Sequence, residues 1–208
     1  MKVLMINGSP RDKGCTFTAL REVAGELEKA GIEVEILHLG TRPIRGCTAC
    51  GHCWSSGTGM CFFDDGQVNV ALEKAKTADG FVFGSPVHYA GASGTITSFL
   101  DRFFYAGEGF ERKPGAAVVS CRRGGSTAAF EQLNKYFTIS GMPVVSSQYW
   151  NMVHGNTPDE VRQDLEGMQI MRTLGRNMAW LLKCIEAGKK CGVPLPELEP
   201  RIATNFIR

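Results

Sequence analysis

Short apolar runs alternate with helix-like segments along most of the chain, and this alternation is what most restricts its fold. Five runs, each bounded by glycine, proline or polar turn residues, have the length and composition of buried or half-buried strands. The expected strands span residues 2–6, 32–39, 80–84, 116–120 and 143–149. Strands that alternate with helices form parallel sheets covered by helices on both faces. The sequence therefore predicts a three-layered α/β fold around a five-stranded, doubly wound parallel sheet.

The segments between these strands carry apolar residues at helical spacing. Helices are expected over 17–27, 67–78, 95–105 and 126–140, followed by a long last helix from Thr157 to Ile185. Thr157 begins a capping box that ends at Glu160 and has proline at the first helical position. Beyond Gly192 the chain is rich in proline. We therefore expect one folded unit over residues 1–190 and an extended C-terminal tail over 191–208.

Charge and hydropathy argue against several classes of protein. The 208-residue chain has a formal net charge of +2, without a basic run suited to nucleic acid or an apolar run of membrane-spanning length. Its apolar N-terminal run ends at Gly8 and is too short for the core of a signal peptide. We expect a cytoplasmic protein that binds neither nucleic acid nor membrane. In that compartment, clustered cysteines are more often metal ligands or redox groups than disulfides.

The loop after the first expected strand, from Asn7 to Thr16, offers groups that bind phosphate. It supplies the hydroxyls of Ser9 and Thr16, the guanidinium of Arg11 and backbone amides at a helix N-terminus. It lacks the Gly-Lys-Ser/Thr ending of a nucleotide-hydrolysing loop and the G-x-G-x-x-G fingerprint of dinucleotide sites. The remaining expectation is a site for a single phosphate monoester.

Two further loops, at residues 85–94 and 120–126, follow the third and fourth expected strands. The carboxyl ends of parallel strands lie at one edge of a sheet, so these loops should share a rim with the phosphate loop. The first supplies the stiff Pro86-Val87 backbone and an aromatic side chain. The second supplies two arginines and two glycines, which let backbone approach a flat ring closely. Apolar walls, backbone donors and positive charge are what an isoalloxazine ring needs.

Four of the eight cysteines lie in residues 46–66, which we call the cysteine segment. Cys47, Cys50 and Cys53 are each separated by two residues, and Cys61 follows after seven more. Thiolates this close in sequence can converge on a [4Fe–4S] cluster, which could exchange single electrons with a flavin. Structural zinc is a second interpretation, although its paired cysteines are usually spaced further apart. The third is a reduced, thiol-rich loop that shapes a subunit interface.

Taken together, these motifs resemble the flavodoxin-like NADPH-dependent FMN reductase superfamily, and more narrowly its iron–sulfur flavoprotein branch. The resemblance rests on GSPRDKGCT at 8–16, the cysteine motif at 46–65, GSPVHYAGASGTITSFLDR at 84–102 and SCRRGGS at 120–126. It implies a flavodoxin-like sheet with strand order 2-1-3-4-5, non-covalently bound FMN, and a homodimer or tetramer. It also implies Cys47, Cys50, Cys53 and Cys61 as the cluster ligands.

The FMN contacts implied by the resemblance come from all three loops of the expected rim. They are Ser9, Arg11, Cys15, Thr16 and Phe17 around the phosphate, Pro86, Val87, His88 and Tyr89 along the ring, and Ser120, Arg122, Arg123, Gly124 and Gly125 opposite. Trp150, Asn151 and His154 follow the fifth expected strand, where they could cover the flavin.

We therefore predict an FMN-dependent oxidoreductase that takes hydride from NAD(P)H. Its acceptor is expected to be a small molecule, such as a quinone, free flavin, nitro or azo compound, or else the iron–sulfur cluster. No catalytic side chain is expected, because the cofactor carries the chemistry. The alternative is an electron carrier like flavodoxin, although carriers of that type are strongly acidic and this chain is not. A redox or metal sensor is a third interpretation, but the sequence has no recognisable output element.

Overall fold

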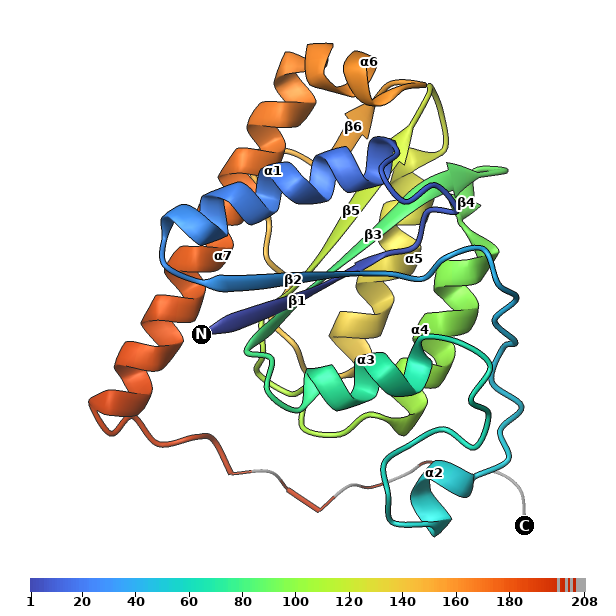
Figure 1. Ribbon diagram of the computed structural model, residues 1–208. Helices are drawn as coiled ribbons and strands as arrows, with labels where there is room; N and C mark the ends of the chain where they lie inside the picture. Colours follow the sequence, from blue (N-terminus) through green and yellow to red (C-terminus); the bar gives the residue numbers. More distant parts are fainter. Residues whose placement is uncertain (198, 201, 203, 205–208) are drawn as a thin grey trace.

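The structure, a computed structural model, describes residues 1–197, 199–200, 202 and 204 (Figure 1). Its centre is a sheet of five parallel strands in the order β2-β1-β3-β5-β6. The strands are β1 (Lys2–Asn7), β2 (Glu33–His38), β3 (Gly80–His88), β5 (Gly115–Cys121) and β6 (Met152–His154). A two-residue strand, β4 (Gly91–Ala92), pairs antiparallel with β3 outside this order. The parallel strands thus follow the predicted order 2-1-3-4-5, and the predicted fold class is confirmed.

Helices cover both faces of the sheet and bury two apolar layers (Figure 1). On one face lie α1 (Cys15–Lys29), α6 (Pro158–Gln163) and α7 (Leu165–Lys190), and on the other lie α3 (Val68–Ala75), α4 (Gly94–Ala106) and α5 (Ser126–Ile139). Side chains alternate across the sheet: Leu4 and Ile6 pack in the apolar layer under α3, α4 and α5, whereas Val3 and Met5 pack in the layer under α1, α6 and α7. The core therefore fixes where every central strand ends.

The fifth strand is not where the sequence predicted it. Residues 143–149 make only an isolated bridge, between Val144 and Gly115, and the strand β6 forms further along the chain. After Val145 the chain leaves the sheet, because the Ser147 hydroxyl donates to the carbonyl of Ile170 on α7 at 2.7 Å. The apolar run at 143–145 has strand composition, but hydrogen bonds to α7 compete with the sheet for the residues that follow.

Two further boundaries differ from the prediction. β3 does not break at Ser85-Pro86 but continues to His88, since β1 ends beside Gly84 and a proline is tolerated where one neighbouring strand is missing. The predicted last helix is two helices, α6 and α7, separated at Asp164. The Asp164 carboxylate accepts from the backbone amide of Gly167 at 2.9 Å and so caps α7.

The cysteine segment lies outside the two helix layers, beside α4, and contains the short helix α2 (His52–Ser55) (Figure 1). The tail after α7 is extended over its described residues, and the remainder of the predicted 191–208 tail falls outside them. None of the described helices is both long and apolar enough to cross a membrane.

Candidate functional site

A cavity of about 230 Å³ opens at the carboxyl ends of β1, β3 and β5. The loop after β1, the start of α1 and the last residues of β3 and β5 form most of its wall, and the loop after β6 closes one side. Its lining residues are Ser9, Pro10, Arg11, Cys15, Thr16, Pro86, Val87, His88, Ser120, Cys121, Arg122, Gly155 and Asn156. The three loops predicted to share a rim therefore do meet in one cavity, which we call the rim cavity.

The loop between β1 and α1 is held by its own polar side chains. The Asn7 side-chain oxygen accepts from the Ser9 amide at 3.1 Å, and the Ser9 hydroxyl accepts from the Arg11 amide at 3.1 Å. Within the described chain no side chain caps the first turn of α1, which begins at Cys15. Its first amides are open to a ligand beside Arg11, as an anion requires.

The loops are also fixed to one another. The hydroxyls of Thr16 and Ser120 lie 2.8 Å apart and join the first loop to the third. Gly125 has a φ of +89°, and a Cβ there would lie 2.5 Å from the Cα of Ala90 in the β3–β4 turn. That turn has positive φ at both Tyr89 and Ala90, as a two-residue type I′ hairpin requires. The loop after β5 thus packs closely against the turn between β3 and β4.

Two thiols in the rim cavity are poor nucleophiles. Burial raises the pKa of the Cys15 thiol, and burial likewise raises the pKa of the Cys121 thiol. Both side chains are therefore neutral at pH 7, and the Cys15 sulfur lies 3.7 Å from the carbonyl oxygen of Gly155. The rim cavity contains binding groups, with Arg11 and Arg122 as its positive charges. This is the chemistry of an anion site rather than of covalent catalysis.

The structure brings together most of the predicted FMN contacts, but not all of them. Ser9, Arg11, Cys15, Thr16, Pro86, Val87, His88, Ser120 and Arg122 line the rim cavity, whereas Phe17 lines a separate hollow beside Arg21. Tyr89 is fully exposed at the tip of its turn, and Arg123 and Gly124 lie outside the lining. Gly125 supports the lining through its contact with the β3–β4 turn.

Sequence reasoning missed Gly155 and Asn156, which line the rim cavity from the loop after β6. The signal was their position directly after a strand, which was hidden by the misplaced fifth strand. Of the residues proposed to cover the flavin, Trp150 and His154 line a neighbouring cavity of about 350 Å³ instead. Asn151 is buried, and its side-chain amide has no hydrogen-bond partner among the described residues.

The four cysteines of the cysteine segment line one small cavity between that segment and α4. Its other lining residues are Thr48, Gly51, Phe62, Phe63, Arg102, Tyr105 and Ala106. Cys47 and Cys50 are exposed, Cys61 is half-buried and Cys53 is buried. The four cysteines predicted to share a site therefore line one cavity, and their convergence on a single metal group stays a prediction.

Polar contacts to α4 and α3 hold the inner half of this site. The carbonyl of Tyr105 accepts from the Trp54 indole at 2.9 Å and lies 3.8 Å from the Cys53 sulfur. Asn69 on α3 makes two hydrogen bonds to the backbone of Cys61, at 2.9 and 3.0 Å. Burial raises the pKa of the Cys53 thiol in the metal-free chain. A bound metal would reverse that shift, because it stabilises the thiolate.

The four thiols match the ligand set of a [4Fe–4S] cluster, which is four cysteine sulfurs. Among the described residues, no three His, Cys, Asp or Glu side chains converge closely enough to hold one metal ion. Structural zinc needs four ligands at about 2.0–2.3 Å from one point. The four cysteines that hold a [4Fe–4S] cluster surround a larger body, so their sulfurs stand further apart. Four cysteine sulfurs around one cavity are thus the kind of ligand that a [4Fe–4S] group requires, and among the described residues they do not form a ready-made site for a single ion.

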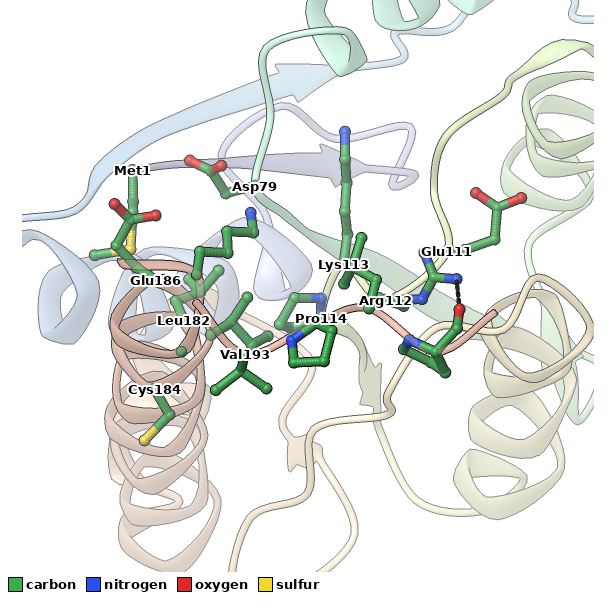
Figure 2. Close-up of a pocket in the computed structure, with 16 residues that line it drawn as sticks. Met1, Asp79, Glu111, Arg112, Lys113, Pro114, Leu182, Cys184, Glu186 and Val193 are labelled. Atoms are coloured by element: carbon green, nitrogen blue, oxygen red, sulfur yellow. Dashed lines mark hydrogen bonds between the residues drawn. The ribbon is translucent and has the colours of Figure 1, made fainter. Parts of the chain in front are cut away.

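A larger cavity, of about 550 Å³, lies at the opposite edge of the sheet between α7, the β5 entry loop and the tail. Figure 2 shows Val193 of the tail beside Pro114, and Arg112 donates a long hydrogen bond, 3.5 Å, to the carbonyl of Pro196. The lining of this 550 Å³ cavity includes none of the predicted FMN contacts and none of the cysteines at 47–61. The tail thus packs against the fold far from the rim cavity.

Comparison with known proteins identifies the family of the chain. Residues 1–157 match the family described as NADPH-dependent FMN reductase. An iron-sulfur flavoprotein of Methanocaldococcus jannaschii is 33% identical over 195 residues, which cover 89% of this chain and 100% of that protein. The structure of RosB with bound 8-demethyl-8-formylriboflavin-5′-phosphate superposes with a TM-score of 0.70 at 16% identity, covering 100% of this chain and 94% of that one. A flavodoxin from the domain Archaea gives a TM-score of 0.58 at 18% identity, covering 88% and 99%. This chain therefore belongs to the NADPH-dependent FMN reductase family of flavin-dependent oxidoreductases, and within it to the iron–sulfur flavoproteins.

Proposed function

We propose that this protein is an NAD(P)H-dependent FMN oxidoreductase that binds FMN in the rim cavity. The observation that carries the proposal is the meeting of three strand-end loops around the uncapped first turn of α1. That turn and Arg11 suit a phosphate, while Pro86 and Val87 provide an apolar wall for a ring. The family match supports NADPH as the donor.

In this proposal the residues of the chain bind and orient FMN, and FMN supplies the redox chemistry. Bound FMN supplies hydride and single-electron transfer. Ser9, Thr16 and the open amides of α1 would hold its phosphate, and the ends of β3 and β5 would offer a wall for its ring. Arg122 places positive charge in the same cavity and so favours negative charge on the bound ring.

The overall reaction is a two-electron transfer. NAD(P)H loses a hydride and becomes NAD(P)⁺, and the acceptor gains two electrons and, with one proton from solvent, two hydrogens. A quinone, free flavin, nitro or azo compound can each serve as such an acceptor. The cavity lined by Trp150 and His154 adjoins the loop that closes the rim cavity, and we propose it as the side from which substrate approaches.

We also propose a [4Fe–4S] cluster held by Cys47, Cys50, Cys53 and Cys61. Four thiols around one cavity, in a chain related to iron–sulfur flavoproteins, support this part of the proposal. When bound, the cluster exchanges one electron at a time, whereas NAD(P)H delivers two. The chain would then pass electrons between a two-electron donor and a one-electron partner.

Self-association is the last part of the proposal. Trp54, Phe62, Tyr149 and Trp150 each expose at least half of their side-chain surface. Large exposed aromatic side chains are enriched at protein interfaces. We propose a homodimer or tetramer, which sedimentation velocity at several protein concentrations would detect as an increase in mass above 22.7 kDa.

The decisive experiment uses anaerobically purified protein. FMN titration followed by flavin fluorescence should show saturable binding, with riboflavin bound more weakly because it lacks the phosphate. When the FMN-loaded protein is mixed rapidly with NADPH, the flavin absorbance should decrease. This decrease should be at least as fast as the turnover of the protein with an added quinone. Failure to bind FMN would refute the proposal. Binding without reduction by NADPH or NADH would instead identify an electron carrier like flavodoxin.

A further inference from the structure

Arg102 on α4 buries a guanidinium group under the cysteine segment, where its side chain is only 1% exposed. One terminal nitrogen donates to the carbonyl of Arg45 at 3.3 Å and pairs with the carboxylate of Asp65, and the other donates to the carbonyl of Phe63. Arg45 precedes the first cysteine of the segment and Phe63 follows the last. Arg102 therefore ties together the two ends of the cysteine segment.

The Nε–H group of Arg102 donates to a cysteine. The Nε atom lies 3.2 Å from the sulfur of Cys61. A buried cation loses much of its hydration and needs anionic partners. Asp65 is one such partner, and the Cys61 sulfur would be a second when it binds a metal, because a metal-bound thiol is deprotonated. Asn69 fixes the backbone of the same cysteine, so Cys61 is held through its sulfur and its main chain together.

We propose that Arg102 positions Cys61 as a cluster ligand and raises the reduction potential of the cluster by donating a hydrogen bond to that sulfur. The proposal rests on the [4Fe–4S] group proposed above. Reduction adds one electron to the cluster, while the guanidinium keeps its proton and no bond is broken. A hydrogen bond and a positive charge at a ligand sulfur stabilise the more negative, reduced state. Arg102 is thus a positioning residue that acts through Cys61.

Arg45 provides a matched control for the charge. Its guanidinium lies 4.5 Å from the centre of the Phe63 ring and its Nε 3.8 Å from Asp65, and it is half exposed. Among the described residues, its side chain makes no hydrogen bond to a cysteine sulfur. Arg102→Gln removes the charge and the bond to sulfur together with the bonds to Arg45, Phe63 and Asp65. Arg45→Gln removes a charge and the contacts to Phe63 and Asp65 from the same neighbourhood, but no bond to sulfur.

The test measures the holoprotein after anaerobic reconstitution with iron and sulfide. Iron and acid-labile sulfide per chain are determined first, and the cluster potential is then measured by redox titration followed by electron paramagnetic resonance. We expect the reduction equilibrium constant of Arg102→Gln to fall about tenfold further than that of Arg45→Gln. For a one-electron couple this is a potential about 59 mV more negative.

Each outcome bears on a separate claim. Equal shifts in the two variants would overturn the role of Arg102 and leave the cluster standing. Wild-type protein that takes up no iron and sulfide would overturn the cluster and the role of Arg102 together, while FMN binding and NADPH oxidation would remain to be judged independently.

A second measurement needs no change at Arg102, in case the Gln variant does not fold. Protein is labelled with ¹⁵N only in arginine, and electron spin-echo modulation is recorded on the reduced cluster. A nitrogen coupling that persists in Arg45→Gln is the expected result, because among the described residues Arg102 is the arginine that donates to a cysteine sulfur. Absence of any arginine nitrogen coupling would overturn the proposal.

Discussion

The rim cavity and the cysteine segment are built in different ways, although we propose a redox group for each. The rim cavity is formed by loops that continue directly from paired strands, so the ends of β1, β3 and β5 fix its position. The cysteine segment leaves the fold after β2 and returns before α3, and a few side chains of α3 and α4 hold it. One site depends on the sheet, and the other depends on a small number of polar anchors.

Because of this difference, substitutions at the two sites should have different effects on cofactor binding and on the stability of the domain. A change in the rim cavity must disturb loops that also pack against one another, so it should affect cofactor binding and the stability of the domain together. A change in the cysteine segment disturbs a region at the margin of one apolar layer, which includes Cys53, and no residue of the segment lines the rim cavity. It should therefore remove the metal site while leaving the flavin site intact. The predictions below test this separation.

Gly125→Ala should have the largest effect. The new Cβ would lie 2.5 Å from the Cα of Ala90, and the backbone would keep a φ of +89° that alanine disfavours. Strain and overpacking together should cost about 3 kcal/mol of unfolding free energy. Chemical denaturation measures this loss, and FMN titration should show weakened binding. Gly124→Ala is the control, since a Cβ there meets nothing within 4 Å, and an equal loss in that variant would contradict the explanation.

Cys61→Ser should abolish the cluster while sparing the flavin. Removal of one of four thiolate ligands should lower cluster retention at least about a hundredfold, as measured by iron and acid-labile sulfide. FMN affinity should stay within about twofold, because Cys61 lies outside the rim cavity. Cys184→Ser, at an exposed position on α7, should change neither quantity. A parallel loss of FMN binding in Cys61→Ser would show that the two sites are coupled.

Arg11→Gln should weaken FMN binding about tenfold, because a charge-assisted hydrogen bond contributes about 1.5–3 kcal/mol. Riboflavin affinity should not change, since riboflavin has no phosphate for Arg11 to contact. Lys13→Gln removes a charge from the same loop at a residue that lines a different hollow, and it should leave FMN affinity nearly unchanged. Equal weakening of FMN and riboflavin by Arg11→Gln would place the arginine away from the phosphate.

The contrast between the sites also explains which parts were predictable from sequence. The rim cavity follows from a general rule, because the loops after parallel strands meet at one edge, and nine of its lining residues were predicted. Gly155 and Asn156 were missed because Val144 and Val145 have strand composition, while the hydrogen bonds of Ser146 and Ser147 to α7 are invisible in the sequence.

The anchoring of the cysteine segment could not be predicted in the same way. Helical spacing marks residue 102 only as a position on α4. Its partners at 45, 61 and 65 are 57, 41 and 37 residues away in the sequence. The spacing of the four cysteines predicted a common site, but it contains no information on which side chain of the main fold holds that site. A long-range contact made by one buried arginine has no local pattern.

The smallest expected effect concerns the helix that carries the phosphate loop. Glu26 on α1 is 7% exposed and forms ion pairs with Lys29 at 2.6 Å and with Arg176 of α7 at 2.7 Å. These partners, Lys29 first and then Arg176, hold the pKa of Glu26 below its ordinary value of 4.5. The folded chain therefore binds this proton more weakly than the unfolded chain, so the contribution is present above pH 4.5 and is lost as the pH falls through the lower, folded value.

Glu26→Gln should accordingly cost about 1 kcal/mol of unfolding free energy at pH 7, because both partners are largely exposed to solvent. The cost should shrink on acidification below the ordinary pKa of the carboxyl group. Urea denaturation at pH 7 and at pH 3 measures both values. Glu28→Gln, which breaks an exposed pair with Arg21 on the same helix, should cost less at pH 7. A cost for Glu26→Gln that did not depend on pH would mean that the packing of α1 against α7, rather than the charge of Glu26, supports the phosphate loop.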